Sequence, residues 1–203
     1  MNCTATDANI LWLLGLSAAI FLVVLALAFA AERIFRSPPP KMSPRPFGAA
    51  LVKWLLAATV CSTAATLALN FAAERLSAAL GLDLPKQDLV ILLQNGSLAP
   101  FTRAMIVVFA LFEAPLLEEA IFRRYLYRNL LRAKSLAPWG AMVISGAAFS
   151  CVHFNTVTFV PLWFFGAALA WIYQRTGRLT AAMSVHFLFN AVNLAILFLF
   201  PEA

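Results

Sequence analysis

Charged side chains are scarce in this chain, and their scarcity excludes an ordinary soluble domain. Only 12% of the 203 residues are charged, and 63% are hydrophobic, whereas about a quarter of a typical soluble domain is charged. No charged side chain occurs from Ser135 to Gln174 or from Leu179 to Pro201. Long uncharged apolar stretches of this kind are typical of membrane proteins.

Cysteine and histidine are also few. The three cysteines, Cys3, Cys61 and Cys151, are odd in number and widely separated, so they form no metal-type motif and are expected to be small apolar packing residues. The composition suggests no nucleic-acid partner, because the net charge of +6 is better explained by membrane topology. We expect no cofactor and no metal.

Six apolar stretches approach the roughly 20 residues that a membrane-spanning helix needs. They cover about 10–31, 51–73, 101–122 with a helical extension to about 132, 137–158, 161–174 and 179–200. A shorter apolar piece at 89–93 fits either an interfacial helix or a re-entrant turn. The sequence predicts an all-α, polytopic membrane helix bundle with about six transmembrane helices. Residues 1–100 would form N-terminal transmembrane helices with connecting loops, and 101–203 a four-helix membrane core.

The first stretch is expected to be a retained anchor. Ala28-Phe29-Ala30 resembles a signal cleavage site, but no basic segment precedes the apolar run, which is longer than a typical signal sequence.

Lysine and arginine are distributed unevenly over the connections, which predicts the orientation of the chain. Twelve basic residues fall in alternate connections: Arg33, Arg36, Lys41, Arg45, Lys53, Arg123, Arg124, Arg128, Arg132, Lys134, Arg175 and Arg178. The opposite side receives Arg75, Lys86 and Arg103. The twelve should face the cytoplasm, which leaves both termini outside. Size and alanine–leucine content favour the cytoplasmic (inner) membrane of a prokaryote.

Two adjacent acids, Glu118 and Glu119, end an apolar stretch and are followed by Arg123. On a helix, Glu119 and Arg123 share one face in the favourable order for an ion pair, and Glu118 points about 100° away. Ionisable groups within membrane spans are costly and are functional candidates. The alternative is a cluster at the end of the span whose charges reach the membrane surface, and this suits the later arginines better.

The chain has two histidines, His153 and His186, and both lie in later apolar stretches. His153 follows Phe149 by four residues, and Asn190 follows His186 by four, so each pair lies on one helical face. Glu118 and His153 are equally far from the connection near 134–138, about 25 Å at 1.5 Å per residue. In an antiparallel helical hairpin, they are therefore expected to face each other. A single histidine in a membrane span is more often a packing residue.

These residues resemble the three motifs E-E-x-x-x-R, F-x-x-x-H and H-x-x-x-N of the CPBP family. This family of intramembrane glutamic endopeptidases includes CAAX prenyl proteases and bacteriocin-processing enzymes. The resemblance covers about 105–195 and implies catalytic roles for six residues. Glu118 with His153 would hold and deprotonate a water, Glu119 with Arg123 would brace the site, and His186 with Asn190 would stabilise the oxyanion. No covalent intermediate is implied.

Two other functions remain open at the level of sequence. Glu118, His153 and His186 are a possible zinc ligand set, although the H-E-x-x-H motif of metalloproteases is missing. The chain is alternatively a non-catalytic membrane protein, such as an immunity factor, scaffold or transporter component. The expected partners are the lipid bilayer and a peptide or membrane-anchored protein substrate, whose prenylation the sequence does not specify. It does not specify the oligomeric state either.

Overall fold

The computed structural model describes residues 5–34, 48–81, 88–94, 98–133 and 136–200, and within these ranges the protein is all-α, as predicted. The N-terminal part contains α1 (Ala5–Ile34), α2 (Ala49–Ala79) and the short α3 (Asp88–Gln94). The apolar piece near 89–93 is thus a helix. The C-terminal part contains a long composite helix followed by α7 (Pro138–Cys151), α8 (Phe159–Thr176) and α9 (Leu179–Leu199).

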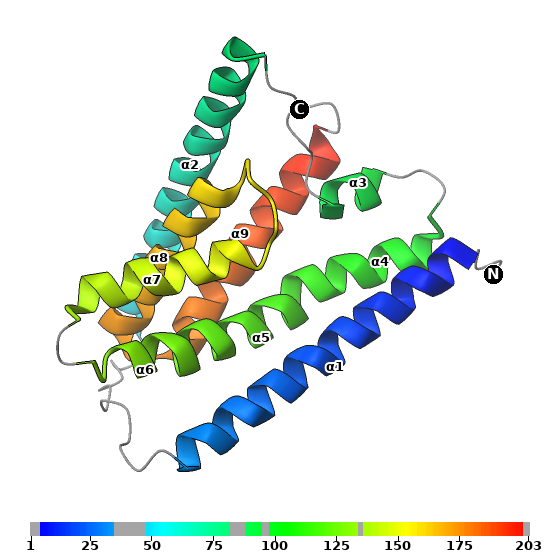
Figure 1. Ribbon diagram of the computed structural model, residues 1–203. Helices are drawn as coiled ribbons and strands as arrows, with labels where there is room; N and C mark the ends of the chain where they lie inside the picture. The colour runs from blue at the N-terminus through cyan, green and yellow to red at the C-terminus, as the bar shows by residue number, and fades with distance from the viewer. Residues whose placement is uncertain (1–4, 35–47, 82–87, 95–97, 134–135, 201–203) are drawn as a thin grey trace.

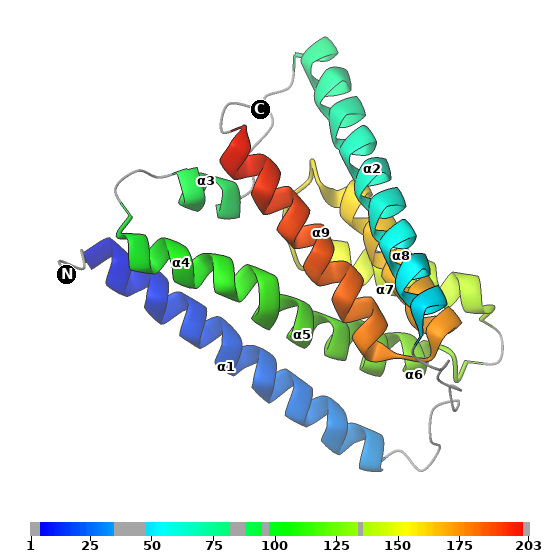
Figure 2. The same ribbon diagram turned by 180° about the vertical axis from the view of Figure 1, so that it is seen from behind.

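The composite helix contains two π-helical segments. It consists of α4 (Pro100–Val108), the π-helical segment η1 (Phe109–Glu113), α5 (Ala114–Glu119), the π-helical segment η2 (Ala120–Tyr127) and α6 (Arg128–Leu130). It begins with Pro100, which suits a first turn because the missing N–H is not needed there. Figures 1 and 2 show α1 lying alongside it over much of its length.

Two of the described helices, Ala49–Ala79 and Leu179–Leu199, are long and apolar enough to cross a membrane. Large apolar side chains also remain exposed on the outside of the bundle, among them Trp12, Val60 and Leu199. Contiguous exposed apolar surface is unusual for a soluble monomer. The fold is that of an all-α membrane helix bundle, and the number of spans stays a prediction.

The fourth apolar stretch was expected to remain helical to 158, but α7 ends at Cys151. Phe154 has a φ of 48°, in the left-handed region that an α-helix cannot contain. The side-chain oxygen of Asn155 then accepts hydrogen bonds from the backbone N–H groups of Val157 and Thr158. This local arrangement competes with helix continuation and places His153 in the connection to α8.

The cysteines do not pack as expected. Cys61 and Cys151 are both exposed, so the expectation that they are small apolar packing residues was wrong. Cys3 lies outside the described residues.

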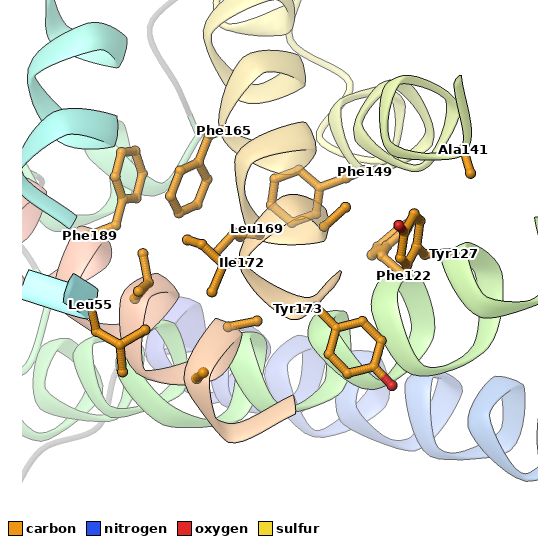
Figure 3. Close-up of a cluster of buried hydrophobic side chains, with 14 of the residues drawn as sticks. Leu55, Phe122, Tyr127, Ala141, Phe149, Phe165, Leu169, Ile172, Tyr173 and Phe189 are labelled. Carbon is orange, nitrogen blue, oxygen red and sulfur yellow. The ribbon is translucent and has the colours of Figure 1, made fainter. Parts of the chain in front are cut away.

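The main hydrophobic core joins α2, α7, α8, α9 and the η2 segment. Figure 3 shows Phe149, Phe165 and Phe189 turned toward one another from three different helices. The rings of Phe165 and Phe189 are stacked, with centroids 3.8 Å apart. This aromatic layer borders the polar residues of the composite helix and fixes the spacing of the helices around them.

Helices α7 and α8 approach each other through two glycines. A Cβ atom on Gly146 would lie 2.7 Å from the carbonyl oxygen of Trp163 and 2.7 Å from the amide nitrogen of Ala167. One on Gly166 would lie 2.9 Å from the Cα of Gly146. Small residues permit such backbone contact between helices in membranes, so both positions require glycine.

Candidate active site

The adjacent glutamates lie on α5, a short α-helical stretch between two π-helical segments. Pro115 lies in the first turn of α5. A proline within a helix has no N–H to donate to a carbonyl of the preceding turn. Just before it, the N–H of Ala114 bonds to the carbonyl of Phe109, five residues back, instead of Ala110. Single π turns within α-helices are frequent at functional sites.

This winding leaves the carbonyl of Ala110 without its usual backbone partner. The Nδ2 atom of Asn190 on α9 donates to that oxygen over 2.8 Å. Asn190 thus joins α9 to the composite helix at the level of η1. Because an amide nitrogen carries two protons, one N–H of Asn190 remains for another acceptor, and the residue lines the cavity described below.

Glu119 is the centre of the polar cluster and is fully buried. Its Oε2 lies 3.0 Å from Nε of Arg123, one turn along the same helix, as the sequence predicted. Its Oε1 accepts a hydrogen bond from Nδ1 of His186 over 3.0 Å. One carboxylate therefore connects the composite helix to α9, a link that the sequence did not indicate.

Arg123 is held from three directions. Besides the ion pair with Glu119, its Nη2 donates to the carbonyl of Gly166 over 3.0 Å. Its guanidinium carbon lies 4.7 Å from the centroid of the Phe149 ring, which is within cation–π range. Arg123 is fully buried, so it belongs to this cluster and not, as the orientation count assumed, to a cytoplasmic loop.

Glu118 differs from its neighbour because it is not neutralised by arginine. Its Oε2 lies 3.8 Å from Nε2 of His186, beyond hydrogen-bond distance. That oxygen is buried and has no hydrogen-bond partner among the described residues. Since Glu118 lines the cavity, its free oxygen is available to a small polar molecule such as water.

His153 and Glu118 line the same cavity, as the hairpin geometry suggested, although the two side chains form no direct hydrogen bond within the described residues. The Nδ1 atom of His153 lies 2.8 Å from the carbonyl oxygen of Phe149. A carbonyl only accepts, so Nδ1 carries the proton. In a neutral imidazole, Nε2 is then the acceptor.

The cavity has a volume of about 770 Å³ and reaches from the polar cluster to one end of the bundle. Its polar lining residues include Glu118, His153, His186 and Asn190. Further lining residues come from the start of α1, the end of α2, α3, the composite helix, the end of α7, the connection from α7 to α8, α8 and the end of α9. Helix α6 and the connection from α8 to α9 lie at the opposite end of the bundle (Figure 1), and their sequences contain Arg128 and Arg178.

A metal site does not assemble from the histidines and glutamates in the described ranges. No three side chains of His, Cys, Asp or Glu there are grouped closely enough to hold an ion. Glu118, His153 and His186 line one cavity, but they do not converge on a common point.

The sequence analysis did not name Gly166 as a contributor to the site and did not predict the contacts that Phe149 makes there. Phe149 was seen as a motif residue, yet its ring packs against Arg123, against His153 at 4.8 Å and against His186 at 5.7 Å between centroids. Gly166 supplies a carbonyl, which every residue has, so no sequence signal could have identified it. The F-x-x-x-H spacing was a usable signal for Phe149.

Comparisons with known proteins support the sequence motifs. Residues 100–192 match the family model described as type II CAAX prenyl endopeptidase Rce1-like. The matched segment begins with α4 and includes all six residues of the polar motifs. No significant match was found among curated proteins. None was found among solved structures.

Proposed function

Because residues 100–192 form a domain of the Rce1-like type II CAAX prenyl endopeptidase family, we propose that the protein is an intramembrane glutamic endopeptidase. The family supports a membrane protease. The observation that carries the glutamate mechanism is the pair of unequal acids. Glu119 is neutralised and fully buried, while Glu118 presents an unpartnered oxygen to the cavity.

Glu118 is proposed as the general base. A base must reach the proton of the attacking water within hydrogen-bond distance or through one water. The free oxygen of Glu118 and the acceptor Nε2 of His153 line the same cavity, so a water between them has two acceptors for its protons. Glu118 takes one proton as the water attacks the peptide carbonyl, and returns it to the leaving amine.

Asn190 and His186 are proposed to bind the oxyanion of the tetrahedral intermediate. Asn190 has one N–H left after its bond to Ala110. His186 already donates Nδ1–H to Glu119, so it donates from Nε2 only as an imidazolium. Glu119 therefore has a second proposed task besides bracing Arg123, which is to orient the His186 ring through its Nδ1.

The substrate is proposed to be a peptide or membrane-anchored protein that enters from the end of the bundle where the cavity lies. This end is opposite the basic connections. If the basic connections face the cytoplasm, the scissile bond is presented from the extracytoplasmic side of a cell membrane. Residues 101–203 supply the proposed catalytic core, and residues 1–100 supply part of the cavity wall.

The proposal is tested with the purified full-length protein, a panel of membrane-anchored peptides and mass spectrometry of the products. Wild type should cleave at a defined bond, and Glu118→Gln should lower kcat by about 100-fold to 10,000-fold with an unchanged melting temperature. A scaffold or immunity protein would cleave nothing. A zinc protease would lose activity in a chelator and regain it with added zinc, whereas we expect chelators to have no effect.

A further inference from the structure

The wall that α2 contributes to the cavity carries polar residues that the proposed mechanism does not use. Thr66, Asn70 and Glu74 follow one another at four-residue intervals and all line the cavity. Residues four apart lie on one face of a helix, so they form a single polar stripe. Polar residues within membrane helices usually face a cavity and mark the path of a substrate.

Asn70 differs from Thr66, the residue one turn before it in the stripe. Thr66 donates to the carbonyl of Ser62 over 2.8 Å, so its hydroxyl is satisfied within its own helix. The Oδ1 atom of Asn70 is buried and has no hydrogen-bond partner among the described residues. A buried acceptor without a donor costs about 1–3 kcal/mol. A ligand that brings an N–H group to this position recovers that cost.

The charge of the cavity points to the kind of donor. Two carboxylates line it, Glu74 and Glu118, and no lysine or arginine does so within the described residues. His186, proposed to donate as an imidazolium, lies beside Glu118 and not beside Glu74. Glu74 makes no ion pair in the described part of the chain. The outer wall therefore presents an amide oxygen and a carboxylate one turn apart, which together suit a positively charged donor.

We propose that Asn70 and Glu74 form a subsite for a cationic group of the peptide substrate, either a lysine or arginine side chain or a free terminal ammonium. This inference rests on the proposed peptidase function and adds the substrate class. Asn70 accepts one N–H of the cation, and Glu74 supplies the charge. Such charge-assisted hydrogen bonds are roughly twice as strong as neutral ones.

The subsite lies away from the reacting bond. Leu55 of α2 belongs to the same core cluster as Phe189, which packs near His186 through Phe165. Asn70 is fifteen residues further along α2, about 22 Å at 1.5 Å per residue. An extended peptide advances about 3.3 Å per residue, so the cationic residue binds several residues from the scissile bond.

Binding of short leucine–alanine peptides that carry one lysine, one norleucine or one glutamate tests the subsite without any need for cleavage. The full-length Glu118→Gln protein is used in detergent, so that neither turnover nor the catalytic carboxylate contributes. We expect the lysine peptide to bind at least about tenfold more tightly than the norleucine peptide. Moving the lysine along the peptide should give one preferred position.

Three further substitutions are each combined with Glu118→Gln. Glu74→Gln should abolish the preference for the lysine peptide, and Asn70→Leu should weaken it. Glu74→Lys should instead make the glutamate peptide the preferred one. Glu113→Gln is the matched control, since Glu113 does not line the cavity, and should keep the preference. Equal binding of lysine and norleucine peptides, or a preference that survives Glu74→Gln, would overturn the subsite. Either result would leave cleavage by the wild-type protein, and hence the peptidase function, untouched.

Discussion

Helix α2 and the helices of the active site both contain buried polar residues, but they satisfy them differently. On α2, Thr59 bonds to the carbonyl of Leu55 over 2.9 Å, and Thr66 bonds to that of Ser62 over 2.8 Å. These bonds stay within one helix. In the proposed catalytic part, Arg123 donates to Gly166 on α8, and Asn190 donates to Ala110 on the composite helix.

These two kinds of hydrogen bond differ in whether they fix the positions of neighbouring helices. A hydroxyl bonded to its own helix places no restraint on neighbouring helices, so α2 is positioned by apolar packing. A side chain that bonds across helices sets distance and orientation at once, and catalysis needs such precision. Asp7 is the N-terminal exception, because its carboxylate accepts the N–H of Ala99 over 2.9 Å and so ties α1 to the start of α4.

The largest effect should follow from Glu119→Gln, which removes the central link between helices. Arg123 would keep its buried charge without a partner, and breaking a buried pair costs about 3–5 kcal/mol. His186 would lose its anionic acceptor at the same time. We expect a lower free energy of unfolding together with loss of peptidase activity, measured by denaturation in detergent and by product formation.

Glu113→Gln is the control for that change and should leave both quantities near wild type. A Glu119→Gln protein with wild-type stability would contradict the view that cross-helix bonds hold the catalytic part together.

Gly146→Ala should destabilise the contact between α7 and α8. The added methyl group would meet backbone atoms of Trp163 and Ala167, which cannot rotate away, and overpacking typically costs about 1–3 kcal/mol. Since α8 carries the carbonyl that binds Arg123, activity should fall as well. Thermal unfolding measures the first effect and kcat the second.

Gly15→Ala on α1 is the matched control, because nothing lies within 4 Å of its added Cβ. It should be neutral or slightly stabilising. If the two alanine variants have equal melting temperatures, the close approach of α7 and α8 is not required.

Asn190→Ala should lower kcat by about a hundredfold or more, since one donor to the oxyanion is lost. KM should change less, because the bond forms mainly in the transition state. Asn129→Ala removes an asparagine that does not line the cavity and should leave kcat unchanged. Near-normal turnover by Asn190→Ala would exclude Asn190 from the oxyanion site and leave its bond to Ala110 as its sole role.

The smallest effect is expected from Thr59→Val on α2. Valine keeps the shape of threonine and loses only a bond within the helix, so the free energy of unfolding should change by no more than about 0.5 kcal/mol. Ser145→Ala is the cross-helix counterpart, because its hydroxyl donates to the carbonyl of Phe122 over 3.0 Å. It should cost about 1 kcal/mol. Equal costs in a denaturation series would remove the distinction between the two regions.

Much of this arrangement could be predicted from hydropathy and helical spacing. The all-α fold, the ion pair between Glu119 and Arg123 and the shared cavity of Glu118 and His153 follow from periodicities of four residues and from the hairpin between α5 and α7. Such predictions succeed because they depend on local geometry along a helix or across one turn.

The parts that could not be predicted involve partners distant in the sequence or common to every residue. The bond from His186 to Glu119 joins positions 67 residues apart, and Arg123 binds a main-chain carbonyl. The early end of α7 depends on the side chain of Asn155 competing for backbone N–H groups. Pro115 is evident in the sequence, but the π-helical winding before it leaves the carbonyl of Ala110 free to accept a hydrogen bond from Asn190, which is 80 residues away.

The π-helical segments before and after α5 determine the direction in which Glu118 and Glu119 point around the axis of the composite helix. Each residue added to or removed from a helix turns everything beyond it by about 100° relative to what precedes it, and a π turn holds an additional residue. Deleting the exposed Phe112 from η1 should therefore let that turn rewind as an ordinary α-helix. The rewound helix would be regular, yet its acids would face away from the histidines. In this protein, a regular α-helix would therefore place the glutamates where the proposed mechanism cannot use them.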